Sequence, residues 1–295
     1  MTRTAYLDCV GGLAGDMLVA ALLDAGGELE ELLALPSRLG LGSVSVEVAR
    51  VERQGVAALH VEFGVPEDAG QRDWQLIREL LAAADLTTSV RDSSLAVFER
   101  LAHAEARVHG IDPDDVHFHE LGAADTLLDV CGAVALLEDL GVERVVCSPL
   151  PVARGIVAAE HGLLPLPAPA TVALLEGAPL YGVEGDLELV TPTGAALAAT
   201  LADRFAELPP LRLERAGYGA GTRDVPHRPN VVRVLIGEEL AAPAPEVVLI
   251  ETNLDDFSPE LVPDAVERCF GAGALDVWTA PAHMKKGRPG FVFSA

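Results

Sequence analysis

The sequence predicts an α/β (α+β) protein, in which an N-terminal α/β domain with a mixed sheet is followed by an incomplete α+β C-terminal domain. Three observations support this prediction. Short apolar runs of strand character alternate with stretches of helical spacing along most of the chain. A glycine loop follows the first apolar run and precedes a helix. The segment AAPAPE at 241–246 lacks element signals, so we place a linker there, between domains at 1–240 and 247–295.

Apolar spacing, capping residues and turn residues assign the elements in order. The first are a strand at 6–9, the glycine loop at 11–15, a helix from 16, strands at 44–48 and 58–63 with a turn at Gly55, two helices between 74 and 109, a helix at 122–140 and a strand at 144–147. Then follow a helix at 169–176, a strand at 188–190, a loop with a threonine cap at 191–194, a helix at 195–205 and a strand at 231–236. The second domain is expected to begin as β-α-β, with a strand at 247–253, a helix at 259–270 and a strand at 275–279.

Composition excludes several function classes. The chain has 295 residues, with 21 Lys and Arg against 45 Asp and Glu, and a formal charge of −24. This charge disfavours nucleic acid and anionic lipid surfaces as partners. No segment resembles a signal peptide or a membrane span, so we expect a cytoplasmic protein. The four cysteines form no CxxC pair, and we expect buried free thiols rather than disulfides or a thiolate zinc site.

The run VHFHELGAADTLLD at 116–129 concentrates metal-binding side chains. In an extended backbone His117 and His119 lie on the same face, and Asp125 and Asp129 lie four apart on one face of the helix that follows. Glu120 lies at the entry to this helix. These groups suit Zn, Ni, Fe or Mn. The alternative is structural: the carboxylates stabilise the helix N-terminus and the histidines are half exposed.

The first glycine loop, DCVGGLAGDM, has the strand–loop–helix setting of a phosphate site. Gly11, Gly12 and Gly15 bring backbone N–H groups together, but Asp8 and Asp16 flank them and no lysine follows. The loop therefore predicts either a phosphate bound through a bridging Mg or Mn ion or a purely structural turn.

Three later loops add polar groups. TPTG contains Thr193, and GYGAGTRD contains Arg223, which either binds a phosphate or forms a salt bridge. ETNLDD places Glu251, Asp255 and Asp256 at the end of a predicted strand. Such oxygen-rich clusters bind Mg, Mn or Ca, and the alternative is a helix N-cap.

Taken together and in order, the motifs YLDCVGGLAGDM, HFHELGAADTLLDVCG, EHGLLPLPAPAT, ELVTPTGAA, GYGAGTRD, ETNLDDFSPE and MKKGRPG resemble the LarC family of nickel insertion proteins. The resemblance covers about residues 4 to 290. It implies a nickel chelatase of the lyase class that inserts Ni(II) into pyridinium-3,5-bisthiocarboxylic acid mononucleotide. In this family the reaction depends on CTP, with Mn or Mg, and the nickel-pincer nucleotide product serves lactate racemase.

We assign roles within this chemistry from the residue types. The residues expected to bind metal are His117, His119, Asp8, Glu251, Asp255 and Asp256. Those expected to hold nickel or to accept the proton released from the ring carbon are Glu120, Asp125 and Asp129. Those expected to bind the nucleotide are Gly11, Gly12, Gly15, Asp16, Thr193 and Arg223.

The family's C-terminal domain continues well beyond MKKGRPG, so we expect this chain to lack the last quarter to third and to expose a sheet edge. A separate C-terminal segment would complete the second domain, and we expect a homo-oligomer. Two other functions are open: a nickel-binding metallochaperone without catalysis, and a metal-dependent hydrolase.

Overall fold

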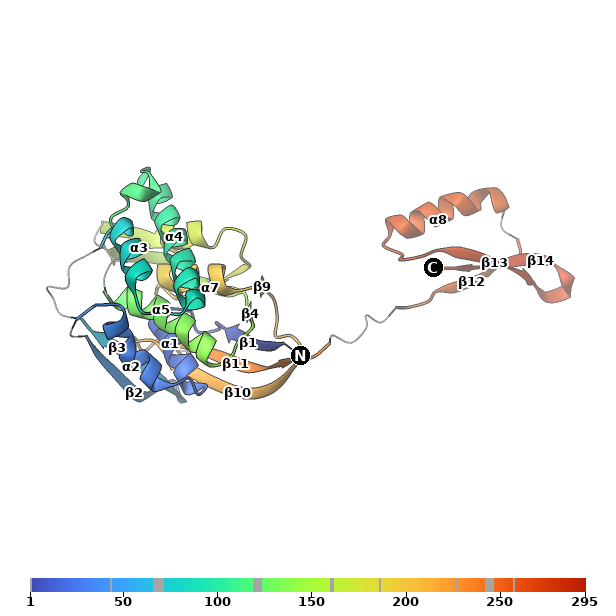
Figure 1. Ribbon diagram of the computed structural model, residues 1–295. Helices are drawn as coiled ribbons and strands as arrows, with labels where there is room; N and C mark the ends of the chain where they lie inside the picture. The colour runs from blue at the N-terminus through green and yellow to red at the C-terminus, as the bar shows by residue number, and fades with distance from the viewer. Residues whose placement is uncertain are drawn as a thin grey trace. The chain divides into compact units, whose positions relative to one another are not determined.

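The computed structural model describes residues 2–42, 44–65, 72–118, 124–159, 162–185, 187–225, 228–241, 247–256 and 258–295. The chain divides into two compact units, Met1–Ala241 and Ala242–Ala295 (Figure 1). The first unit has both parallel and antiparallel strands together with helices, which confirms the predicted fold class.

A seven-stranded mixed sheet forms the base of the first unit. Its strands, in spatial order, are β2 (Ser45–Arg53), β3 (Val56–Gly64), β10 (Leu211–Ala220), β11 (Val231–Glu239), β1 (Arg3–Asp8), β4 (Arg144–Cys147) and β9 (Arg204–Phe205). β1 is an interior strand, parallel to β4 and antiparallel to β11. β2 and β3 form the predicted hairpin, whose turn has positive φ at Gln54 and Gly55.

Helices cover one face of this sheet (Figure 1). They are α1 (Gly15–Asp24), α2 (Leu29–Arg38), α3 (Trp74–Ala83), α4 (Thr88–His109), α5 (Ala124–Asp139), α6 (Pro169–Leu174) and α7 (Pro192–Leu201), with a 3-10 turn, η1 (Pro113–Asp115). α1 is buried on nearly all sides, between the sheet and α5. Its backbone lies against β10, where a Cβ added at Gly217 or Gly219 would overlap the α1 backbone.

Two small sheets follow β4. β5 (Leu150–Ala153) pairs in parallel with β8 (Leu180–Val183), and β6 (Gly155–Ala159) forms a hairpin with β7 (Gly162–Leu166). None of these four strands is predicted by the apolar spacing.

Three predicted elements in the first unit are wrong in detail. Residues 188–190 form no strand. Val190 forms only an isolated bridge with Leu13 of the glycine loop, in which the Leu13 N–H donates to the Leu189 carbonyl and the Thr191 N–H donates to the Leu13 carbonyl. The helix predicted at 195–205 is α7, which ends at Leu201, and the next residues form β9 beside β4. The GYGA run at 217–220 belongs to β10, because Gly217 and Gly219 lie where the sheet meets α1.

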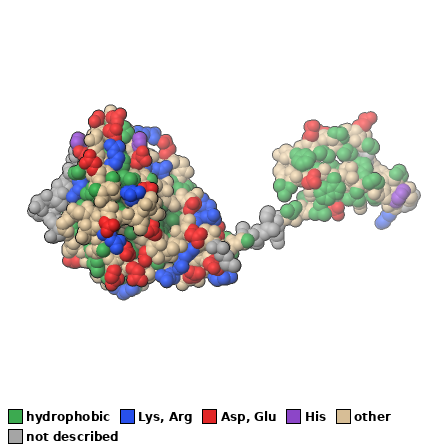
Figure 2. All heavy atoms as spheres, viewed as in Figure 1, with side chains coloured by type: hydrophobic (Ala, Val, Ile, Leu, Met, Phe, Trp, Pro, Cys, Tyr) green, Lys and Arg blue, Asp and Glu red, His purple; other side chains and the backbone are tan. Residues whose placement is uncertain are grey.

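The second unit is a three-stranded antiparallel sheet in the order β12 (Glu251–Leu254), β14 (Pro289–Ser294) and β13 (Trp278–His283), with α8 (Val262–Gly271) and the 3-10 turns η2 (Pro259–Leu261) and η3 (Lys285–Gly287). The strands predicted at 247–253 and 275–279 are displaced toward the C-terminus in β12 and β13. Hydrophobic side chains gather on this unit's surface (Figure 2). Val247 to Ile250 are 54–74% exposed, and Leu275 is 80% exposed.

Candidate functional site

Three carboxylates meet where α1 and α5 begin. Asp16 lies in the first turn of α1, and Asp125 and Asp129 lie in the first two turns of α5. Asp129 rests directly on Gly15, where an added Cβ would lie 2.5 Å from Asp129 Oδ2. We call Asp16, Asp125 and Asp129 the carboxylate cluster.

The carboxylate cluster brings negative charges together in a partly buried setting: Asp16 and Asp129 are half-buried and Asp125 is exposed. Burial, followed by the charges of Asp16 and Asp125, raises the pKa of Asp129 well above its usual range. Burial also raises the pKa of Asp16, with a contribution from Asp125. Asp129 accepts the backbone N–H of Asp16, while its Oδ1 is buried without a hydrogen-bond partner among the described residues. The cluster therefore favours a bound proton or a cation.

A cavity of about 240 Å³ lies next to the carboxylate cluster and shares Asp16 with it. Its wall comes from the beginnings of α1 and α7, from β6, and from the two ends of the loop between β10 and β11. The residues are Ala14, Asp16, Met17, Val157, Leu187, Glu188, Leu189, Thr191, Gly221, Thr222, Arg223 and Asn230. The fold thus brings Asp16 and Arg223, which are far apart in the sequence, to one cavity.

The glycine loop forms close backbone contacts instead of an open cradle. A Cβ at Gly11 would lie 2.5 Å from the carbonyl oxygen of Pro229 and would overlap that of Val231, and a Cβ at Gly12 would overlap that of Leu189. The Gly12 N–H donates to the carbonyl of Cys9 at 2.9 Å. These contacts join the loop to β11 and to the segment before α7, and so shape the cavity wall.

His117 lies away from the cavity residues, on the short segment that precedes α5. The segment is extended, with Val116 and Phe118 buried and His117 exposed between them. His117 forms an isolated bridge with Asp73, and the Trp74 N–H donates to the Val116 carbonyl at 3.2 Å. His119 and Glu120 lie outside the described residues.

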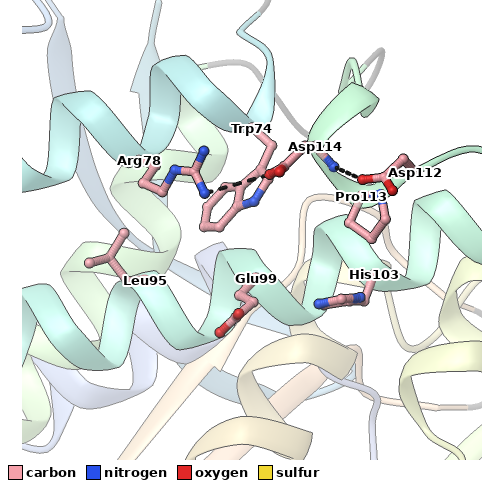
Figure 3. Close-up of a pocket in the computed structure, with 8 residues that line it drawn as sticks. All are labelled: Trp74, Arg78, Leu95, Glu99, His103, Asp112, Pro113 and Asp114. Carbon is pink, nitrogen blue, oxygen red and sulfur yellow. Dashed lines mark hydrogen bonds and ion pairs between the residues drawn. The ribbon is translucent and has the colours of Figure 1, made fainter.

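A groove of about 470 Å³ lies beside Trp74, between α3, α4 and η1 (Figure 3). Arg78 pairs with Asp114 at 3.5 Å and lies over the Trp74 ring. Glu99 and His103 both come from α4, but Figure 3 shows the Glu99 carboxylate pointing away from His103. Within the described residues, no three His, Cys, Asp or Glu side chains are placed to hold one metal ion.

The remaining predicted residues are dispersed. Asp8 ends β1 and is paired with Arg233, whose Nε donates to Asp8 Oδ2 at 3.0 Å. Thr193 is buried in the first turn of α7 and is not part of the cavity wall. On the second unit, the Ser294 hydroxyl donates to Glu251 at 3.0 Å, Asp255 pairs with Arg288 at 3.8 Å, and Asp256 is exposed.

Of the residues in the cavity wall, the sequence predicted only Asp16 and Arg223 as site residues, and Asn230 and Val157 are among those it missed. Asn230 is buried, and its Nδ2 donates to the backbone carbonyl of Arg223 at 2.8 Å. Val157 lies on β6, which was not predicted. A signal for Asn230 existed: had 211–220 been read as a strand, Arg223 and Asn230 would have fallen in one hairpin loop.

The model of the family described as nickel insertion protein matches residues 5–295. The chain belongs to this family. A family member from Thermomicrobium roseum is 48% identical over 99% of the chain and 73% of its own length, and one from Geotalea daltonii is 44% identical over 98% and 75%. Both are named as nickel insertion proteins. A relative from Nocardioides sp. is 44% identical over 99% and 74%, and is named a pyridinium-3,5-bisthiocarboxylic acid mononucleotide nickel insertion protein.

No solved structure matches the chain. In the described part of the chain, no helix combines the length and the apolarity that crossing a bilayer requires. Membership of the nickel insertion family makes nickel the metal that the chain handles.

Proposed function

We propose that this chain inserts Ni(II) into pyridinium-3,5-bisthiocarboxylic acid mononucleotide, as the name of the Nocardioides relative states for that protein. The observation that carries the proposal is the carboxylate cluster, in which a half-buried Asp129 with a raised pKa lies beside a cavity in a nickel insertion family member. The product would be a nickel-pincer nucleotide, and a lactate racemase-type enzyme is the proposed recipient.

The chemistry requires a base. A ring C–H bond is replaced by a C–Ni bond: the electron pair stays on carbon and binds the metal, nickel remains Ni(II), and the proton leaves. A carboxylate whose pKa is raised accepts a proton more readily than an ordinary one. Asp129 and Asp125 are the proposed acceptors in the described residues, and Glu120 is the third proposed group.

The precursor itself supplies most of the nickel ligands. Two thiocarboxylate sulfurs and one ring carbon occupy three of the four positions of a square-planar Ni(II) ion, so the protein needs to supply only one more. We propose that His117 and His119 deliver the metal, and that Asp8 helps to hold a cation.

We assign the CTP dependence, with Mn or Mg, to the second unit. Glu251, Asp255 and Asp256 are the proposed oxygen ligands there. The three relatives extend beyond the matched region, since this chain spans 73–75% of their lengths. We propose that a further segment, within one chain or as a separate one, covers the exposed apolar residues of this unit, and that the protein acts as a homo-oligomer.

We place the reaction in the cytoplasm, on chemical grounds. Cys9, Cys131 and Cys147 are buried free thiols, and the proposed substrate carries two thiocarboxylates. Thiol groups persist in the reducing conditions of that compartment.

The test is product formation. Ni(II) and the precursor are incubated with the chain, with CTP and Mn, and with or without the C-terminal segment of the Nocardioides relative. Mass spectrometry should detect a species that has gained nickel and lost a proton. Asp129→Asn should reduce its formation at least about 100-fold, the usual loss for a positioned base, whereas His103→Ala, an exposed histidine on α4, should not. Release of unchanged nickel, or hydrolysis without nickel uptake, would support the chaperone or the hydrolase instead.

A further inference from the structure

A histidine outside the predicted site, His60, lies where α1 begins on the sheet. α1 packs against both β3 and β10. These two strands share one Cα pair, Leu59 with Gly219, and a Cβ added at Gly219 would overlap the Met17 carbonyl oxygen of α1. His60 follows Leu59 and Asp16 precedes Met17, so the fold brings this histidine close to the carboxylate cluster.

The hydrogen bond of the His60 ring decides which of its nitrogens is free. Nδ1 lies 3.1 Å from the Ala220 carbonyl oxygen, and because a carbonyl can only accept, Nδ1 carries the proton. In the neutral ring, Nε2 then has an unshared electron pair, and it has no hydrogen-bond partner among the described residues. Histidines that bind a metal through one nitrogen commonly donate the other N–H to a backbone carbonyl in this way.

The charges around His60 favour a bound cation. Burial raises the pKa of Asp16 and Asp125 adds to the rise, whereas the Met17 N–H and the positive form of His60 lower it. His60 and Asp16 therefore interact through their charges, although no hydrogen bond or ion pair joins them in the part of the chain that the structure describes. In the same cluster, Asp129 Oδ1 is buried without a hydrogen-bond partner among the described residues.

We infer that His60 Nε2 is the protein ligand that holds Ni(II) at the carboxylate cluster while the precursor is metallated. The inference rests on the proposed function and names the donor for the one coordination position that the precursor leaves to the protein. An imidazole nitrogen suits Ni(II), whereas Mg and Mn prefer oxygen ligands. Nickel bound here is close to the carboxylates proposed to accept the ring proton, so the metal and the base meet the precursor at one place.

One substitution separates this role from a purely structural one. In His60→Asn, the amide Nδ2 replaces Nδ1 as the donor to the Ala220 carbonyl, while the nitrogen at the Nε2 position is lost. The matched control is His103→Asn, at an exposed histidine on α4.

The first measurement is the reaction of the histidines in the whole chain with diethyl pyrocarbonate, which attacks unprotonated ring nitrogens. Peptides are mapped by mass spectrometry after brief treatment without metal, with Ni(II) alone and with Mg(II) alone. His60 should react in the metal-free chain, because its Nε2 has no described partner and the residue is only half-buried. At a Ni(II) concentration about ten times that for half-protection, its modification should fall about 10-fold. Mg(II) should not protect it, and His103 should react alike in all three samples.

The second measurement is Ni(II) binding to the variants by calorimetry. His60→Asn should weaken the binding of one nickel ion at least about 10-fold, while its thermal unfolding midpoint stays within about 2 °C of that of the unmodified chain. His103→Asn should change neither quantity. A His60 that reacts equally with and without Ni(II), that fails to react in the metal-free chain, or whose replacement by Asn leaves nickel binding unchanged would overturn the inference.

Failure of this inference can be told from failure of the proposed function, because protection by Ni(II) requires no turnover. A chain that forms the nickel–carbon product while Ni(II) leaves His60 unprotected would refute the His60 site alone. A chain in which Ni(II) protects His60 but no nickel–carbon product forms would refute the insertion reaction and support the metallochaperone.

Discussion

The position of Asp129 in the fold lowers the free energy of unfolding at neutral pH. Its carboxyl pKa is raised in the folded chain, above all by burial, whereas in the unfolded chain it titrates near about 3.9. The unfolded state therefore releases this proton first as pH rises. The stability that the protonated residue contributes below about pH 4 is lost progressively as pH rises from there through the raised pKa of the folded state. We predict that Asp129→Asn raises the thermal unfolding midpoint at pH 7.5, by roughly 2–4 °C if the gain is about 1 kcal/mol.

This prediction is checked by calorimetry in the presence of a chelator. At pH 4 the variant should lose most of its advantage, because the carboxyl is then protonated in the folded state and about half protonated in the unfolded state. Asp92→Asn, an exposed position on α4, serves as the control and should shift the midpoint little at either pH. A variant that is less stable than the native chain at pH 7.5 would contradict the account of Asp129.

The four cysteine side chains differ in their exposure to solvent. Cys9, Cys131 and Cys147 are buried, while Cys269 is partly exposed, which corrects the expectation that all four are buried. Burial raises the pKa of Cys131 to about 12, and a hydrogen bond with Cys147 raises that of Cys9. We predict that a thiol reagent modifies Cys269 quickly and the other three only on unfolding. Peptide mapping after brief labelling would reveal any early modification of a buried thiol.

At the level of single residues, sequence spacing predicted part of the candidate site. The i, i+4 spacing of Asp125 and Asp129 correctly places both in the first turns of one helix. Sequence spacing did not predict the contact between Asp129 and Gly15, because it depends on how α5 packs on α1. The outward direction of His117 follows from its alternation with two buried neighbours.

Among the elements, the contact between β10 and α1 is the tightest constraint. A Cβ at Gly219 would overlap the Met17 carbonyl oxygen, and α1 has no free side toward which it can shift, since it is buried nearly all round. We predict that Gly219→Ala destabilises the first unit by about 3 kcal/mol, because the added methyl group pushes α1 away from β10.

A denaturant titration of both variants tests this contact against a matched glycine. Gly40 has a φ of +65° and no atoms within 4 Å of an added Cβ. Gly40→Ala should therefore cost only about 1 kcal/mol, from backbone strain alone. Equal losses in the two variants would show that packing against α1 is not what requires Gly219.

Apolar spacing and turn residues predicted those helices and strands whose boundaries depend on the nearby sequence. The β2–β3 hairpin, α3, α4 and β4 lie close to where apolar spacing and turn residues placed them. β10 was missed because its glycines match a loop pattern, although they are required by the helix above them. β9 was missed because two residues carry no periodicity, and only pairing with β4 defines them.

The whole chain carries a large excess of negative charge. At −24, its acidic side chains repel one another, and this repulsion acts most strongly on the compact state. Raising monovalent salt from about 10 to 150 mM shortens the screening length from about 30 to 8 Å. We predict that the thermal midpoint rises over this range, and that NaCl and KCl act alike. A midpoint that falls would mean that ion pairs outweigh the general repulsion.

The position of β1 decides when the first unit can form. β1 is the first strand of the chain, yet it lies between β4 and β11, and its Asp8 pairs with a residue 225 positions later. On a ribosome that adds about 5–20 residues per second, roughly 10–45 s pass between the synthesis of β1 and the synthesis of its partner strand β11. During this interval the apolar residues of β1 have only part of their final surroundings, so the nascent chain is a natural client for chaperones that bind unpaired strands.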